Sequence, residues 1–395
     1  MSTTIPAPPA ELTRFWPAVL ACFMVAVFGW GFGFTGTSVY LAELQRLHGW
    51  PNALVAAAIT TYYLLGALCL TQVHIALRRL GPARLLGAGM LLLGLGATLF
   101  GRSQRPWHMF IAAMFMAVGW AGCTSTAIST SLALYFQRQR GLAITLALNG
   151  ASVAGFTIAP LLAAISQITG VGAAVPLVAI AGLAVVLPLV GIGFASPVQA
   201  EPANQPAPAA QRGLLATWRF WSIALPFALA LAAQVGLIVH LVSLLRPALG
   251  PSGSAAALAL TSIAAVTGRL GLATVIDRLP QRAAAAASFT SQAGGVALLL
   301  AFPHQPAALY AGCVIFGLSV GNVITYPALI VQREFPSSLF GVVVGLSTAF
   351  GQFTFALAPA LLGLIRDLAA SYAPVLALCI TLQLIAAVLV LRQRR

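Results

Sequence analysis

Mostly apolar runs of about 20 residues follow one another along the whole chain, separated by short polar stretches. The chain is 60% hydrophobic and only 7% charged, whereas soluble domains carry roughly 25% charged residues. A helix of about 20 apolar residues is long enough to cross the hydrocarbon core of a bilayer. The runs are continuous rather than alternating, which excludes a transmembrane β-barrel. We therefore expect an all-α membrane protein that crosses the bilayer repeatedly.

Twelve membrane-spanning helices can be drawn from these runs. Their expected ranges are 16–41, 52–77, 84–101, 109–136, 141–166, 173–195, 219–245, 254–277, 284–302, 307–331, 340–365 and 373–391.

A polar stretch rich in Pro and Ala, SPVQAEPANQPAPAAQRG, separates the first six helices from the second six. This composition cannot build a core and predicts a flexible linker. The two sets carry similar sequences at corresponding positions. RRLGPAR follows the second helix and DRLPQR follows the eighth. Pro160 in GFTIAPLL aligns with Pro359 in FALAPALL. Two pseudo-symmetric six-helix bundles resemble the major facilitator arrangement of parallel repeats. The expected organisation is an N-terminal cytoplasmic tail (1–14), a first bundle (15–195), a cytoplasmic linker (196–218) and a second bundle (219–395).

The basic residues predict the orientation, and all 20 of them are arginine. Fourteen fall on the side that holds both termini and the linker, five fall on the other side, and one lies within a helix. This excess places the termini and the linker in the cytoplasm. Because the arginines are scattered between apolar runs, the net charge of +14 does not indicate a nucleic-acid partner. The five cysteines lie in apolar segments without paired spacing, so neither a metal site nor a cofactor is expected.

The arginine within a helix is Arg269, eight residues before the Asp277–Arg278 pair that marks the next loop. At the rise of an α-helix, this spacing places Arg269 roughly 12 Å inside the membrane. A charge at such a depth costs at least about 2.5 kcal/mol and must face the protein interior or water. We therefore predict that Arg269 binds an anion. The alternative is a structural arginine that is hydrogen-bonded to helix ends.

Several neutral polar residues lie at depths from which they could join Arg269 in a cavity. The same counting places Asn149 about 12 Å deep, and the alternative for each residue alone is a hydrogen bond between helices. A single fixed cation favours a monoanion, because an arginine fork matches one carboxylate and a dianion would leave a charge without a partner. The predicted substrate-binding residues are Arg269, Asn149, Asn322, Tyr326, Tyr63, Thr124, Gln234 and Gln352.

His240 is a second titratable candidate, about 20 residues into the seventh predicted helix and therefore in the outer third of the membrane. Its ordinary pKa near 6.5 would suit a role in proton coupling or in gating. The alternative is a hydrogen-bonded packing residue. No acidic residue is predicted near the middle of the membrane.

Three segments are similar to the bacterial monocarboxylate transporter branch of the major facilitator superfamily: YFQRQRGLAITLALNGASVAG (Tyr135–Gly155), the stretch from Val239 to Arg282, and GLIRDLAASYAPVLAL (Gly363–Leu378). The resemblance implies that Arg269 is the family's helix 8 arginine, which binds the substrate carboxylate. The chain departs from the family at Ala265, where many members carry an aspartate, and it lacks the helix 1 lysine. The second cation of the related oxalate–formate exchanger is also missing from the eleventh helix.

The sequence and the resemblance together predict a bacterial inner-membrane transporter of small organic monocarboxylates that works by rocking alternating access, with or without proton coupling. It is expected to be a monomer in the lipid bilayer. The alternatives are a drug or metabolite exporter of the same fold, a sensor that kept this fold, and an integral membrane enzyme. An enzyme would need a cluster of His, Asp, Glu or Cys at one membrane face, and the five histidines are dispersed.

Overall fold

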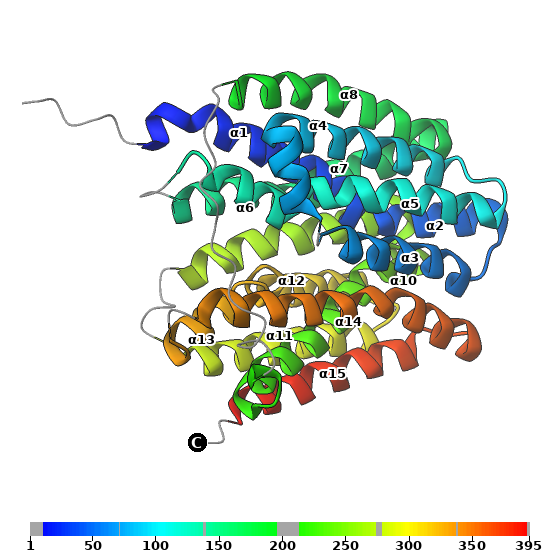
Figure 1. Ribbon diagram of the computed structural model, residues 1–395. Coiled ribbons are helices and arrows are strands. Elements are labelled where there is room, and N and C mark those ends of the chain that lie inside the picture. The colour runs from blue at the N-terminus through cyan, green and yellow to red at the C-terminus, as the bar shows by residue number, and fades with distance from the viewer. Residues whose placement is uncertain are drawn as a thin grey trace, which may run out of the picture.

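The computed structural model describes residues 11–70, 72–136, 140–195, 213–273, 279–336 and 339–392, and these residues form helices and short connections without any strand (Figure 1). The first half contains α1 (Glu11–Trp30), the π-helix η1 (Gly31–Thr35), α2 (Gly36–His48), α3 (Asn52–Leu70), α4 (Val73–Gly101), α5 (Pro106–Cys123), α6 (Ser125–Ala133), α7 (Arg140–Thr169) and α8 (Val171–Gly193). The second half contains α10 (Trp218–Ala273), α11 (Gln281–Ala301), α12 (Pro306–Val323), α13 (Tyr326–Glu334), α14 (Phe340–Ala369) and α15 (Ala373–Leu391).

Eleven helical segments of the described chain are long and apolar enough to cross a membrane. One of them, Trp218–Leu272, is 55 residues long and would extend for roughly 80 Å as a single helix, far more than a bilayer. Gly250 divides it, with a φ of 70° and a ψ of −179° that favour glycine. Residues 218–249 and 251–273 are therefore two crossings, and the predicted fold of twelve membrane-spanning helices is confirmed.

The two halves repeat the same packing device, in which glycines bring two helices into backbone contact. In the first half, a Cβ atom on Gly122 of α5 would lie 2.8 Å from the Cα of Gly89 of α4. In the second half, a Cβ atom on Gly312 of α12 would lie 2.8 Å from the carbonyl oxygen of Gly295 of α11. The recurrence at corresponding helices supports the pseudo-symmetry of the two bundles.

The first described residue, Glu11, lies at the same end of the molecule as the ends of α8 and α15 and the start of α10 (Figure 1). We call this the linker end. The opposite end, which holds the connections at residues 49–51, 102–105, 302–305 and 370–372, is called the closed end.

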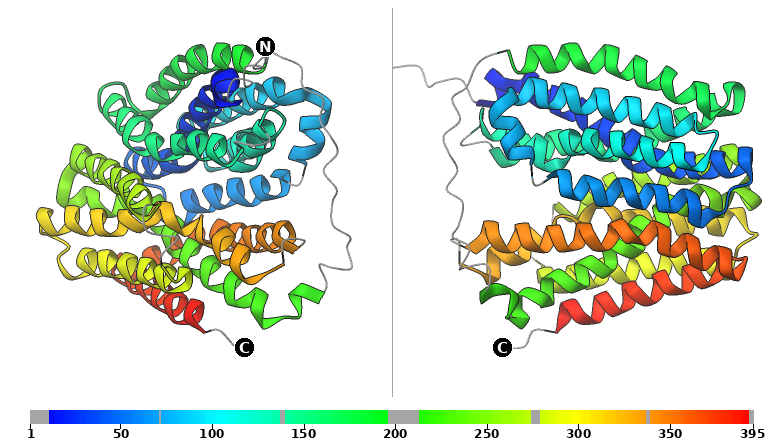
Figure 2. Two further views of the ribbon diagram at one scale, coloured as in Figure 1. Left: turned by 90° about the vertical axis from the view of Figure 1, so that its left-hand side faces the viewer. Right: turned by 45° about the vertical axis from the view of Figure 1, so that its right-hand side comes forward.

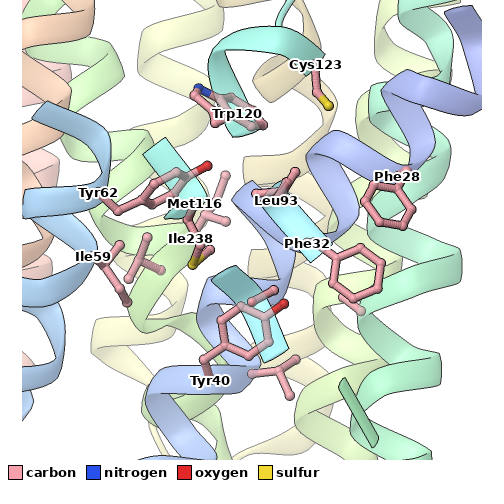
Figure 3. Packing of buried hydrophobic residues seen from close by; sticks show 14 of the residues in the cluster. Phe28, Phe32, Tyr40, Ile59, Tyr62, Leu93, Met116, Trp120, Cys123 and Ile238 are labelled. Atoms are coloured by element: carbon pink, nitrogen blue, oxygen red, sulfur yellow. The ribbon is translucent and has the colours of Figure 1, made fainter. Parts of the chain in front are cut away.

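The helices of the two halves lie close together at the closed end and diverge toward the linker end (Figure 2). The buried apolar clusters follow the same division. One cluster runs through the first half and continues into the closed-end part of the second half, and Figure 3 shows Ile238 of α10 among the aromatic side chains of this cluster. A separate cluster, which includes Phe220 and Val390, fills the second half near the linker end. Among the described residues, the halves therefore share a buried apolar core at the closed end.

Candidate functional site

Arg269 lies on the second crossing of α10, where this helix packs closely against α12. A Cβ atom on Gly268 would overlap the backbone of Leu318, and one on Gly321 would lie 3.0 Å from the Nε of Arg269. The lack of a side chain at Gly321 thus makes room for the guanidinium, whose Nε donates to the Gly321 carbonyl at 3.3 Å. The close crossing therefore positions one edge of the guanidinium.

The other edge of this guanidinium has no partner among the residues that the structure describes. Within the described residues, the Nη atoms of Arg269 make no hydrogen bond and no carboxylate lies within ion-pair distance of Arg269. A structural arginine would use most of its donors on helix ends or acids, as Arg282 does in this chain. The forked Nη edge can instead donate two hydrogen bonds, one to each oxygen of a carboxylate.

Asn322 lies beside this arginine on α12. Its Nδ2 donates to the carbonyls of Gly268 at 3.4 Å and Leu318 at 3.3 Å, while its buried Oδ1 has no partner in the described part of the chain. The side chain therefore tightens the contact between α10 and α12 and retains one free acceptor.

Asn149 of α7 reaches the depth of Arg269 from the other half. A Cβ atom on Gly155 of α7 would overlap the side chain of Ser262 of α10, so the two helices touch at this level. The second crossing of α10 runs antiparallel to α7. Arg269 is seven residues and Asn149 six residues from this contact toward the linker end, which is roughly 10 Å along each helix. Both residues therefore lie on the linker-end side of this contact.

Two predicted residues of the first half are hydrogen-bonded within that half. Tyr63 of α3 donates from its hydroxyl to the carbonyl of Gly33 at 3.3 Å, beside Tyr62, which donates to the same oxygen at 2.9 Å. Gly33 belongs to η1, where the π-helical turn changes the backbone pairing. Thr124 caps α6 by accepting from the amide of Ala127 at 3.4 Å. Both side chains thus stabilise local breaks in helices.

Two of the three remaining predicted residues of the second half are also hydrogen-bonded within their own half. The Gln234 amide oxygen accepts from Gln292 at 2.9 Å, in a buried network that extends to Gln383. Tyr326 pairs its hydroxyl with the hydroxyl of Ser288 at 2.8 Å, between α13 and α11. Gln352 of α14 is half-buried and makes no hydrogen bond in the described part of the chain. Depth alone therefore did not identify the direction in which these side chains point.

His240 lies at the closed end, away from the level of Arg269, in a chain of hydrogen bonds between the two halves. Its Nε2 bonds the carbonyl of Pro359 at 2.9 Å, and its Nδ1 lies 3.4 Å from the hydroxyl of Tyr372. The Tyr372 hydroxyl donates to the Oδ1 of Asn52 at 3.1 Å. The Nδ2 of Asn52 donates to the Oδ1 of Asp367 at 3.1 Å.

The carboxylate of Asp367 also caps the N-terminus of a helix in the other half. Its Oδ2 accepts from the backbone amide of Ala53, at the start of α3, at 2.7 Å. The unpaired amides and the dipole at a helix N-terminus favour a negative charge. Sequence reasoning missed this role, although an acid at the end of the eleventh helix was a visible signal. Asp277, the acid used for the depth argument, lies outside the described residues.

An ion pair provides a second connection at the closed end. Glu43 of α2 is 5% exposed and lies 2.9 Å from Arg246 of α10, and Arg46 lies 3.0 Å from the same carboxylate. Nearby, the hydroxyl of Ser38 donates to the carbonyl of Ile238 at 2.7 Å. The closed end is therefore held by charged and neutral contacts between the halves as well as by the shared core.

Comparisons with known proteins agree with this architecture. A family model described as the Major Facilitator Superfamily matches residues 19–359. A crystal structure of a point mutant of the nucleoside transporter NupG is similar to this chain with a TM-score of 0.76 and 12% sequence identity, covering 94% of this chain and 98% of that one. The crystal structure of nucleoside transporter NupG itself gives a TM-score of 0.70 at 12% identity, covering 94% and 96% of the two chains. No curated protein matches the sequence.

The similarity to NupG at 12% identity shows a shared fold. The family model spans most of the chain, from α1 into α14. The chain therefore belongs to the Major Facilitator Superfamily and is a multi-pass membrane transporter, not an enzyme.

Proposed function

We propose that this transporter carries small organic monocarboxylate anions. One observation supports the proposal above all others: the guanidinium of Arg269 is held at Nε by the Gly321 carbonyl, and its Nη edge has no acceptor in the described chain. A buried charge without a partner is costly, so a bound anion would compensate it. One cation suits one carboxylate, with Asn322 and Asn149 as neutral neighbours at similar depth.

The linker end is proposed to face the cytoplasm of a bacterial cell. The excess of arginines on that side supports this orientation. The halves share their core at the closed end, so the molecule would be open to the cytoplasm. Transport would follow from rocking of the proposed bundles 15–195 and 219–395 about a site between them, with 196–218 as the linker.

A nucleoside is the principal rival substrate, because the similar solved structures are nucleoside transporters. A nucleoside carries no charge and would leave the Arg269 guanidinium uncompensated. The positive charge of Arg269 therefore favours a monoanion. A further alternative is an exporter of drugs or metabolites. No contact described in the site favours it.

Direct binding distinguishes these substrates. We expect the purified transporter to bind pyruvate or lactate at least about tenfold more tightly than malonate or oxalate, a difference of about 1.4 kcal/mol, because a second carboxylate would be desolvated without a partner. Isothermal titration calorimetry with these acids and with uridine measures the order of their affinities. Tighter binding of the dicarboxylates, or binding of uridine alone, would contradict the proposed substrate class.

A further inference from the structure

The charge of Arg269 is not neutralised by any acid that the structure describes. The whole chain has six acidic residues, and none of the described ones lies within ion-pair distance of Arg269. The four described acids lie toward the two ends of the molecule: Glu11, Glu43, Glu334 and Asp367. The other two, Glu201 and Asp277, lie outside the described residues, in the predicted linker and in the predicted loop after Arg269. The guanidinium therefore keeps its full positive charge in the described part of the chain.

Neutral neighbours compensate this charge only in part. A guanidinium has five N–H donors, and the Gly321 carbonyl accepts from one of them. Asn322 directs its Nδ2 toward the carbonyls of Gly268 and Leu318, which fixes the direction of its Oδ1. Among the described residues, this Oδ1 makes no hydrogen bond with Arg269. The other N–H donors of Arg269 therefore remain for water or for an anion.

Water can fill this role in the state that the structure shows. The halves diverge toward the linker end, and Arg269 is only half-buried, whereas Ser38 and His240 at the closed end are 0% exposed (Figure 2). Alternating access requires an intermediate in which both ends are closed. A linker end packed as tightly as the closed end would separate an empty site from bulk water, and the charge of Arg269 would then be left uncompensated inside the membrane.

We infer that this transporter exchanges one monocarboxylate for another and that its empty form changes sides slowly. A bound carboxylate neutralises Arg269 and accepts from its forked Nη edge, so the loaded site can close at both ends. The empty site cannot close without isolating a bare guanidinium. The carrier therefore returns with a second anion. One negative charge crosses in each direction, so the exchange moves no net charge across the membrane.

The inference rests on the monocarboxylate function proposed above and specifies how transport is coupled. Proteoliposomes test it with radiolabelled lactate or pyruvate, whichever binds more tightly in the calorimetric measurement. Uptake into vesicles preloaded with the same unlabelled acid is expected to be at least about tenfold faster than uptake into vesicles filled with buffer. The cost of an uncompensated charge in a membrane exceeds what a tenfold change in rate requires. Equal uptake into the two kinds of vesicle would overturn the inference.

Ala265 offers a matched pair of variants. It is 4% exposed and precedes Arg269 by about one helical turn, so the two side chains lie on the same face of α10. Ala265→Asp gives the empty site a permanent carboxylate and should raise uptake into buffer-filled vesicles relative to preloaded ones. Ala265→Asn adds a side chain of the same size without the charge and should keep the ratio of the parent protein. Identical ratios in the two variants would contradict the inference. If neither variant folds, the ratio of the parent protein decides.

The conformation of the empty protein tests the inference without any substrate. Spin labels at Arg78→Cys of α4 and Gln332→Cys of α13, exposed positions near the linker end, report the distance between the halves after the five native cysteines are replaced by alanine. In pulsed electron paramagnetic resonance, Ala265→Asp should show a larger short-distance population than the parent protein and than Ala265→Asn. The same distances in all three proteins would overturn the inference. The expected shift together with no binding of lactate or pyruvate would refute the proposed substrate class alone.

Discussion

Replacing Arg269 by glutamine is expected to nearly abolish monocarboxylate transport. Glutamine can still donate to the Gly321 carbonyl, but it removes the charge and the forked Nη edge. Hydrogen bonds to a charged group contribute about 1.5–3 kcal/mol each, so the loss of two should lower affinity by at least about a hundredfold. Arg269→Lys keeps the charge without the planar fork. Its affinity should lie between that of the parent protein and that of Arg269→Gln.

Uptake into proteoliposomes, with binding measured on the same preparations, checks this result. Arg105→Gln removes an exposed arginine at the closed end and serves as the matched control. Its uptake should equal that of the parent protein. Wild-type rate and affinity in Arg269→Gln, with a chromatographic profile of a folded protein in both cases, would show that the site is wrongly assigned.

Replacing Arg282 by methionine is expected to destabilise the second half more than any other single substitution proposed here. Arg282 is 8% exposed and pairs with Glu334 through two bonds, at 2.7 and 2.8 Å. It also donates to Ser222 and to the carbonyl of Val390, so it connects α11 with α13, α10 and α15. Breaking a buried ion pair by removing one partner costs about 3–5 kcal/mol.

Thermal unfolding in detergent measures the effect as a fall in Tm. The double variant Arg282→Met with Glu334→Gln should regain part of the loss, because it also removes the carboxylate charge that Arg282 neutralises. Arg78→Met, at an exposed position near the linker end, is the control and should leave Tm nearly unchanged. An unchanged Tm in Arg282→Met would mean that the ion pair contributes little to stability.

The sequence by itself determined the twelve crossings, because a span depends on the local length and polarity of the chain. The second predicted span, 52–77, corresponds to α3 together with the start of α4, and the ninth, 284–302, to α11. Gly250 lies in the predicted gap between spans 219–245 and 254–277, where the structure has its turn.

Only the tertiary structure decided which neighbours these side chains meet. Gln234 and Tyr63 lie on helices that are apolar on almost every side, so no polar stripe indicated the direction of either side chain. In the folded protein both side chains, and that of Tyr326, make hydrogen bonds inside the bundles. The contacts of Arg269 depend on the close crossing at Gly321, 52 residues farther along the chain. Asn52 and Asp367 are 315 residues apart, and their hydrogen bond exists because two bundles meet at one end. The local sequence pattern predicts how far along a helix a residue lies, whereas its partners follow from the way the helices pack.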